Sequence, residues 1–530
     1  MSKDIAYDIE FLRKASIGVN LLANSVKITL GASGRNVLLE RPSASPIVAN
    51  SGAMIANDMA LPDDTENMGV KIIREAASKT NAAAGDGAAT AIVLSQFILN
   101  EGWKNIAANA NPIELRKGIQ GATQVSAAAI RKLAMPAGTR LALEKVASVS
   151  ANDPVLGSIV AEAMTRVGSR GVVLVEESSG TETVLDIKEG MQLERGYLSP
   201  EMVTDKDRMV AELENPYILI TDQKIEDPQE LIPIMEEIVE KDASLLVVAD
   251  ELEGAALRFL VMNIKNNVFK VAAVRAPAYG EGRIARMEDL ALLTGGSFIS
   301  KTLGLTVREA TLGMLGRASS VIVGKDNASI VGGLGDKAAI EAWIKATEAR
   351  IDKTDYTFSK QQLQDRLAKI TAGVAVIKTG AFTAAEMKEK KLRVDNAVHT
   401  ARAAEREGIV PGGGIAYLRI IPAVKAYAET LSGDRKTGAA IIVKALEAPV
   451  RQIAENAGIE GGIAVAQILK SPAGTGLNAI TGTYENMMDA GIVDAAMVTR
   501  IALQSAASAA ATLLTSRVGI TETKKNNAKR

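Results

Sequence analysis

The sequence contains no cysteine, which excludes disulfide bonds and a thiolate nucleophile. It has a single histidine, His399, which cannot form a zinc site unless carboxylates lie nearby. Aromatic residues make up only 3% of the chain, although 47% of it is hydrophobic. The cores must therefore be built from Ala, Val, Ile and Leu, and this composition favours α/β or mainly helical domains.

Neither sign of charge is in excess, because 61 basic residues face 62 acidic ones and the net charge is −1. Such a chain has no field that would attract nucleic acid or an anionic membrane, so neither partner is expected. Residues 1–8 carry no apolar signal core and no arginine-rich transit pattern, and we find no uninterrupted apolar run long enough to span a bilayer. We therefore expect a cytoplasmic protein.

The 530 residues are too many for one core and predict about three or four domains at ~100–200 residues each. Helical spacing of apolar residues predicts helices near both ends, at 9–31, 66–84, 90–108, 435–470 and 495–517. The middle alternates as in βαβ units, with strand 217–221, helix 228–240, strand 245–249, helix 254–265 and strand 268–274. A charged helix at 361–370, a strand at 373–378 and a long charged helix at 384–407 follow. Residues 524–530 are expected to form a solvated tail.

The most informative segment is the Gly85-Asp86-Gly87 turn between two predicted helices. Its glycines allow the backbone to approach an anion closely, and the first amides of the following helix have no intrahelical acceptors. Asp86 offers the hard oxygen ligand that Mg²⁺ prefers. The turn therefore fits a metal-bound phosphate at a helix start, although such a turn by itself is more often ordinary helix capping.

Further segments of the same kind occur far apart, and together they resemble the group I chaperonins, the bacterial GroEL type. They are Thr29-Leu30-Gly31, Gly34-Arg35-Asn36, Glu66-Asn67-Met68-Gly69, Glu189-Gly190-Met191-Gln192, Arg195 to Pro200, Met387 to Lys391, Gly412-Gly413-Gly414, Asn478-Ala479 and Asp494. The resemblance implies a multi-domain fold of α plus α/β type. Its parts are a mainly helical equatorial domain (1–132 and 407–530), a small α/β intermediate domain (133–188 and 375–406) and a βαβ-containing apical domain (189–374).

The resemblance also implies a site for ATP or ADP with Mg²⁺ in the equatorial domain, with Asp86 as the metal ligand. The residues that it assigns to the nucleotide are Thr29, Leu30, Gly31, Asp86, Gly87, Ala88, Ala89, Thr90, Val149, Ser150, Gly413, Asn478, Ala479 and Asp494. Typical members have threonine where Ala88 and Ala89 stand, so two hydroxyl donors are missing. Because the backbone amides survive such changes, we expect weakened rather than abolished ATP binding.

The positions that the family uses for hydrolysis differ more. Asn50 and Ser51 stand where the family has lysine and aspartate, and Asn396 stands where it has the aspartate that activates water. Losing a general base typically costs ~10²–10⁴ in rate, so slow hydrolysis is expected. Asp395 is adjacent but points about 100° away on a helix, and should not replace the lost carboxylate.

In the apical domain, the helix at 254–265 is apolar around more of its circumference than one buried face requires. The resemblance implies a groove that binds non-native polypeptide clients and a co-chaperonin of the GroES type. Its residues would be Tyr197, Met202, Ile232, Met235, Leu257, Val261 and Met262.

The expected protein is thus a chaperone that assists folding or assembly in a homo-oligomer, a seven-membered ring or double ring. Whether it counts as an ATPase enzyme depends on how much hydrolysis remains. Two alternatives stay open. One is a fully active ATP-hydrolysing foldase, and the other is a non-hydrolysing assembly scaffold or holdase for a dedicated client.

Overall fold

The computed structural model describes residues 3–41, 44–168, 171–178, 180–206, 208–278, 280–354, 356–371 and 373–522, so the expected tail at 524–530 lies outside the described residues. The chain divides into two compact units. Unit 1 comprises Met1–Glu162, Glu177–Thr183 and Thr379–Arg530, and unit 2 comprises Ala163–Glu176 and Val184–Lys378. Both ends of the chain therefore build unit 1 and its middle builds unit 2. The finer division into three domains stays a prediction.

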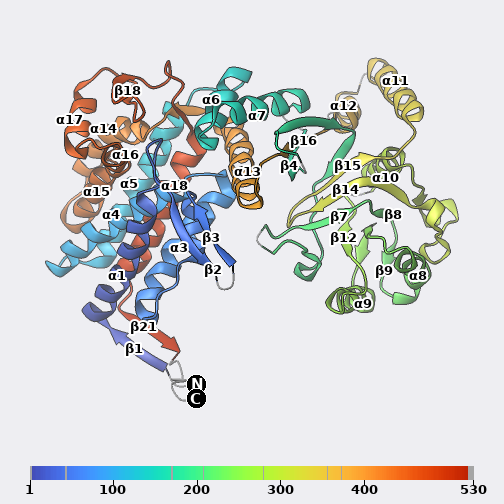
Figure 1. The fold of residues 1–530 in the computed structure, drawn as a ribbon, viewed down its shortest axis with the longest axis horizontal. Helices are drawn as coiled ribbons and strands as arrows, with labels where there is room; N and C mark the ends of the chain where they lie inside the picture. Colours follow the sequence, from blue (N-terminus) through green and yellow to red (C-terminus); the bar gives the residue numbers. More distant parts are fainter. Residues whose placement is uncertain are drawn as a thin grey trace. The chain divides into compact units, whose positions relative to one another are not determined.

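Unit 1 is centred on five long helices from both ends of the chain. They are α1 (Asp8–Lys27), α3 (Asp64–Ala84), α4 (Ala88–Ala107), α5 (Pro112–Leu133) and α18 (Ala496–Leu514). In Figure 1 the blue helices α1, α3 and α4 lie beside the red α18, and α18 contacts α3, α4 and α5. On α1, apolar residues at helical spacing face this core, among them Val19, Leu22 and Val26.

Helix α18 bears on the expectation that the chain has no uninterrupted apolar run long enough to span a bilayer. By length and composition it is the one helix in the described part of the chain that could cross a membrane, although Arg500 and Gln504 interrupt its apolar residues. It is also mostly buried, with both Ala496 at its start and Leu514 at its end in the protein interior. Its apolar character is therefore accounted for by the core of unit 1.

The remaining helices of unit 1 are shorter, apart from the long α13. They are α2 (Gly52–Asp58), α6 (Arg140–Ala151), α13 (Ala384–Glu407), α14 (Ile415–Glu429), α15 (Gly433–Ala445), α16 (Ala448–Asn456) and α17 (Gly461–Lys470); α7 (Pro154–Val167) leads along the chain into unit 2. The helix expected over 435–470 is thus three helices. Pro449 lies in the first turn of α16, and Gly458 adopts φ +79° between α16 and α17, so the helix cannot continue there.

Four antiparallel strand pairs complete unit 1. They are β1 (Lys3–Tyr7) with β21 (Val518–Glu522), β2 (Val37–Arg41) with β3 (Ala44–Ala49), β17 (Ile409–Pro411) with β20 (Val493–Ala495), and β18 (Thr475–Leu477) with β19 (Tyr484–Asn486). The pairing of β1 with β21 joins the two ends of the chain.

Unit 2 contains the predicted βαβ alternation. The parallel strands β8 (Tyr217–Thr221), β10 (Leu245–Ala249) and β12 (Val271–Arg275) alternate with α8 (Ile232–Glu240) and α9 (Gly254–Lys265). Successive residues of β10 enter opposite cores, Leu246 and Val248 on one face and Leu245 and Val247 on the other. This explains why the strands are apolar throughout, because both faces are buried. Helix α8 begins later than predicted, after a 3₁₀ turn, and β12 begins at Val271.

The sheet of unit 2 continues beyond β8 with antiparallel strands, in the order β12-β10-β8-β14-β15-β6. The added strands are β14 (Gly316–Val323), β15 (Ala328–Gly333) and β6 (Gly190–Leu193), with β7 (Ala211–Glu214) on β14 and β13 (Phe298–Ile299) on β8. A second sheet has the order β4 (Val172–Glu177), β16 (Val374–Thr379), β5 (Val184–Lys188), and β9 (Lys224–Ile225) pairs with β11 (Glu251–Leu252). The other helices are α10 (Glu281–Thr294), α11 (Lys337–Lys353) and α12 (Thr357–Thr371), with 3₁₀ turns at Pro200–Met202, Pro228–Glu230, Lys301–Leu303, Val307–Glu309 and Leu312–Met314.

Candidate nucleotide and polypeptide sites

The turn between α3 and α4 has the geometry expected from its sequence. Gly85 ends α3 at φ +78° and Gly87 precedes α4 at φ +88°, both in the left-handed region that favours glycine. Asp86 lies between them, and its Oδ1 accepts a hydrogen bond from the Gly87 amide at 2.6 Å. The first-turn amides of α4 have no carbonyl four residues earlier within the helix, so they can bind an anion at this point.

Two carboxyl groups at this turn, those of Asp86 and Asp494, have raised pKa values. Burial raises the pKa of Asp86, while bonds from the Gly87 amide and the Ser150 hydroxyl oppose that rise. Burial, with a further contribution from the charge of Asp86, raises the pKa of Asp494 to about 7. A divalent cation would relieve this repulsion, and a carboxylate with neighbouring hydroxyls is a donor set that suits Mg²⁺. The described residues contain no cluster of three or more His, Asp or Glu side chains that could hold a metal, so phosphate or water would have to supply further ligands.

Asp494 is positioned by a short strand pair. It lies on β20 opposite Val410 of β17, and the chain leaving β17 forms the glycine triplet. Gly413 and Gly414 adopt φ +63° and +80°, and Gly414 is the residue that precedes α14. The start of helix α14 therefore follows β17, and β17 pairs with β20, the strand that carries Asp494.

The other predicted nucleotide residues form a second set of contacts. After α1, the carbonyl of Leu30 accepts a hydrogen bond from Asn456 Nδ2 at 2.8 Å. Ser33 Oγ donates to the Ala479 carbonyl at 2.9 Å, which ties the loop containing Gly31 to the loop after β18. Asn478 Nδ2 donates to Glu485 at 2.7 Å. Among the hydrogen bonds of the described residues, none joins this set directly to Asp86, and Val149 is exposed at the end of α6.

Helix α13 packs against the segments that lie beside the Gly85-Asp86-Gly87 turn. Asn50 Nδ2 donates to Glu389 Oε1 at 3.0 Å, and Arg393 donates to the Ala151 carbonyl at 3.1 Å. About two turns further along, the Oγ1 atom of the buried Thr400 lies 3.1 Å from Ser150 Oγ. These contacts join α13 to the end of β3 and to the end of α6.

The backbone of α13 also approaches the Gly85-Asp86-Gly87 turn directly. A Cβ atom at Gly85 would lie 2.2 Å from His399 Cβ and 3.0 Å from the Thr400 amide nitrogen. Glycine is therefore required at 85 both by its φ and by this approach. The sequence indicated a glycine turn here, but only the structure shows these two reasons for it.

Asn396 lies on the docked face of α13. It is three residues after Arg393 and four before Thr400, so the three side chains share one stripe of the helix. Both of its neighbours on that stripe contact segments of the candidate site, and Asn396 itself is half-buried. The stripe thus places an amide, rather than a carboxylate, towards this region.

Ser51 lies beside the start of α4. Its side chain caps α2 by accepting a bond from the Met54 amide at 3.5 Å. A Cβ on the next residue, Gly52, would approach the Ala89 backbone nitrogen to 2.9 Å. The sequence prediction identified both 51 and 396, but it missed Thr400, because a threonine in a charged helix gives no signal of its contact with α6.

The sequence matches the TCP-1/cpn60 chaperonin family over residues 22–518. The chain belongs to that family. The predicted resemblance to chaperonins is therefore confirmed, and with it a chaperonin-type function in protein folding. The fold is similar to that of the chaperonin gp146 from bacteriophage EL 2 (Pseudomonas aeruginosa), crystallised in the presence of ATP-BeFx. That comparison has a TM-score of 0.67 at 19% identity and covers 98% of this chain and 99% of the phage protein, which confirms the predicted multi-domain α plus α/β fold.

In unit 2 of this chaperonin, α9 leaves an apolar face uncovered. Ala256 and Leu260 are buried, whereas Leu257 and Val261 are half-buried and Met262 is 62% exposed. A single core-facing stripe would not expose a methionine to this degree beside two further apolar residues. The surface of α9 therefore has the apolar side chains that a non-native polypeptide could contact.

Two residues predicted for the same surface are in the core. Met202 is 1% exposed and Met235 is 5% exposed, and both pack in the cluster that includes Leu219 and Leu260. The Met202 sulfur accepts a bond from the Ala273 amide on the edge strand β12 at 3.3 Å. In this structure both methionines pack internally and cannot contact a client. Of the other predicted residues, Tyr197 and Ile232 are half-buried.

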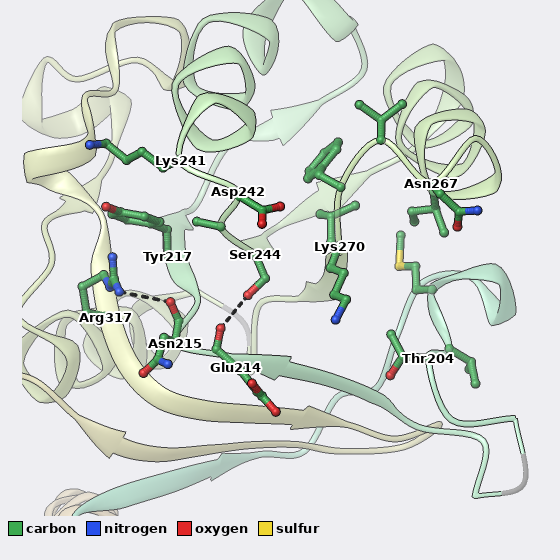
Figure 2. Close-up of a pocket in the computed structure, with 17 residues that line it drawn as sticks. Thr204, Glu214, Asn215, Tyr217, Lys241, Asp242, Ser244, Asn267, Lys270 and Arg317 are labelled. Carbon is green, nitrogen blue, oxygen red and sulfur yellow. Dashed lines mark hydrogen bonds between the residues drawn. The ribbon is translucent and has the colours of Figure 1, made fainter.

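Unit 2 also has a cavity of about 770 Å³ that sequence reasoning did not identify. Figure 2 shows it at the amino ends of β8, β10 and β12. The Arg317 guanidinium lies 4.0 Å from the ring centre of Tyr217 and donates to the Asn215 carbonyl at 3.1 Å. The lining mixes both signs of charge with polar groups, and it comes from several separated segments, which is why no sequence motif reveals it.

Proposed function

We propose that this chaperonin binds magnesium and ATP in unit 1, captures non-native polypeptide in unit 2, and hydrolyses ATP slowly. The observation that supports slow hydrolysis is the stripe of α13, on which Asn396 stands between two residues that contact the segments of the candidate site. An amide can hold a water molecule by hydrogen bonds, but it cannot accept the proton of that water.

The chain's own groups account for nucleotide binding. Asp86 would hold the metal, which when bound neutralises phosphate charge, and the first-turn amides of α4 would donate to phosphate oxygens. Ala88 and Ala89 begin that helix without hydroxyl groups, so fewer donors are available and affinity for ATP is reduced.

Client capture is assigned to α9, because Met262 and its half-buried neighbours form an apolar surface that adaptable methionine side chains suit. A homo-oligomeric ring and a co-chaperonin of the GroES type complete the proposal, and both rest on family membership. The phage chaperonin of similar fold was crystallised with an ATP analogue, which supports a nucleotide site in this architecture.

Phosphate release at saturating magnesium–ATP tests the proposal. The wild-type chain should be slow, and Asn396→Asp should increase the rate by about 10²-fold, because a general base contributes ~10²–10⁴. Ser51→Asp should add to this effect, since aspartate can also cap α2. Asn396→Ala is the control, because it changes the same position without supplying a carboxylate, and its rate should stay low.

The outcomes separate the alternatives. A wild-type rate equal to that of ordinary chaperonins would refute slow hydrolysis and favour the active foldase. Nucleotide binding without any increase in Asn396→Asp would show that the missing carboxylate at 396 is not what limits the rate. If purified wild-type chain binds no nucleotide, the scaffold or holdase is the better description.

A further inference from the structure

The hydroxyl of Ser150 lies between two oxygen atoms. Its Oγ is 3.3 Å from Asp86 Oδ2 and 3.1 Å from Thr400 Oγ1. A serine hydroxyl has one hydrogen and can donate to only one of them at a time. The three side chains, from the metal-binding turn, α6 and α13, therefore form a hydrogen-bonded chain in which the direction of each bond depends on the next.

The charge of Asp86 selects the direction. A bond from a hydroxyl to an ionised carboxylate is stronger than one between two neutral groups, so Ser150 donates to Asp86 when that carboxyl is ionised. The Ser150 hydroxyl is placed to donate to either Asp86 or Thr400, and when it donates to Asp86 its own oxygen is left to accept the hydrogen of Thr400. Because Thr400 is 4% exposed, water cannot readily replace Ser150 as the partner of its hydroxyl.

Two other buried threonines on helices of unit 1 behave differently. Thr80 Oγ1 donates to the Ala76 carbonyl at 2.8 Å, and Thr123 Oγ1 donates to the Ile119 carbonyl at 2.7 Å, so each satisfies its hydroxyl within its own helix. Thr400 instead bonds to a different helix, 250 positions away in the chain. Its hydroxyl is therefore placed for a contact between α13 and α6 rather than for its own helix.

Helix α13 also comes close to the Gly85-Asp86-Gly87 turn at Thr400. The backbone of His399 and Thr400 approaches Gly85 so closely that a side chain there would collide. Asn396 is one helical turn before Thr400 on the same face. Any change in the bond from Thr400 to Ser150 therefore acts on both the orientation of Asp86 and the docking of the stripe that carries Asn396.

We propose that Thr400 is a positioning residue of the metal site: through Ser150 it orients the Asp86 carboxylate for Mg²⁺ and couples metal binding to the docking of α13. This inference rests on the nucleotide site proposed above. Groups that hydrogen-bond to a metal-ligating carboxylate typically change metal affinity 10–100-fold when they are altered.

The test is ADP binding by calorimetry on the full-length chain, with excess Mg²⁺ and with a chelator instead. Thr400→Val removes the hydroxyl and keeps the volume, so it should reduce the gain in affinity that Mg²⁺ provides by about 10-fold. Binding in the chelator should be unchanged. Thr400→Ser keeps a hydroxyl and should keep the gain in affinity that Mg²⁺ provides. The double variant Ser150→Ala with Thr400→Val should lose no more of this gain than the more affected single variant, because both residues act through one chain of hydrogen bonds.

Thr123→Val is the matched control, since it removes a buried threonine hydroxyl in the same unit away from this site, and it should keep the full effect of Mg²⁺. Hydrogen exchange gives a second readout: Mg²⁺ with ADP should protect the α13 amides near 397–402 in wild type and in Thr400→Ser, but not in Thr400→Val. A Thr400→Val protein with the wild-type effect of Mg²⁺, or a Thr400→Ser protein that behaves like Thr400→Val, would overturn this inference alone. Wild-type chain with no Mg²⁺-dependent binding would overturn the proposed site as well.

Discussion

Replacing Gly85 by alanine should separate α13 from the Gly85-Asp86-Gly87 turn. The new Cβ would lie 2.2 Å from His399 Cβ. Two carbon atoms in van der Waals contact need ~3.5–4.0 Å, so the helix and the turn must move apart by roughly 1.3–1.8 Å. Such a displacement would break or weaken the 3.1 Å contact between Thr400 and Ser150. We expect a loss of ~1–3 kcal/mol from this overpacking, in addition to the backbone cost.

Gly458→Ala measures the backbone cost by itself. Gly458 has φ +79°, against +78° for Gly85, and a Cβ there would meet nothing within 4 Å. A left-handed alanine costs ~1–2 kcal/mol at either position, so the difference between the two variants isolates the contact with α13. Urea unfolding gives both losses, and hydrogen exchange of the α13 amides reports docking. Equal losses with equal exchange in the two variants would refute the close approach of α13 to the turn.

Two further predictions concern the client surface and a buried ion pair. Met262→Glu should weaken capture of an unfolded client about 10–100-fold in a binding assay, because burying a methionine side chain contributes ~1.5–3 kcal/mol. The control is Leu303→Glu, at a residue that is 63% exposed and lies outside α9. Equal capture by both variants would argue against α9 as the client-binding surface. The Arg500 guanidinium, with Nε 2.8 Å from Glu407, lowers the pKa of that carboxyl, so the pair's contribution is complete above the ordinary pKa and is lost as pH falls through the lowered one. Glu407→Gln should therefore cost about 1–2 kcal/mol in urea unfolding at pH 7, and progressively less as the pH falls below the ordinary pKa of a glutamate. Glu522→Gln, in an exposed pair, should cost ~0–1 kcal/mol and is the control. A pH-independent loss in Glu407→Gln would contradict the assignment.

The elements of the fold were predictable where the signal is local. Strands β8 and β10 have the predicted bounds, and helix α9 runs over the residues expected for it, because their apolar patterns end abruptly at polar or glycine residues. Residues 435–470 are mainly helical as expected, but the sequence did not predict their division into three helices, since a break at Gly458 depends on how the chain turns there. Composition does not separate α18 from a membrane-spanning helix, because an alanine-rich interior helix has a similar composition, and its burial is visible only in the structure.

The residues of the candidate sites also fall into those that the sequence indicates and those that only the structure reveals. The sequence identified the Gly85-Asp86-Gly87 turn and the neutral residues at 51 and 396, since each is a departure visible in one segment. It did not distinguish Met262, which is exposed, from Met202, which is buried, because both are methionines in apolar surroundings. Burial depends on what packs from other segments, and for Met202 that partner is the edge strand β12.

The amino-acid sequence by itself determined the family, the βαβ character of the middle of the chain and the presence of a glycine turn between two helices, because glycines and alternating apolar runs act over a few neighbouring residues. Only the tertiary structure decided that Thr400 meets Ser150 and that Gly85 lies against α13. Those contacts join residues hundreds of positions apart, and they exist because both ends of the chain pack into one unit.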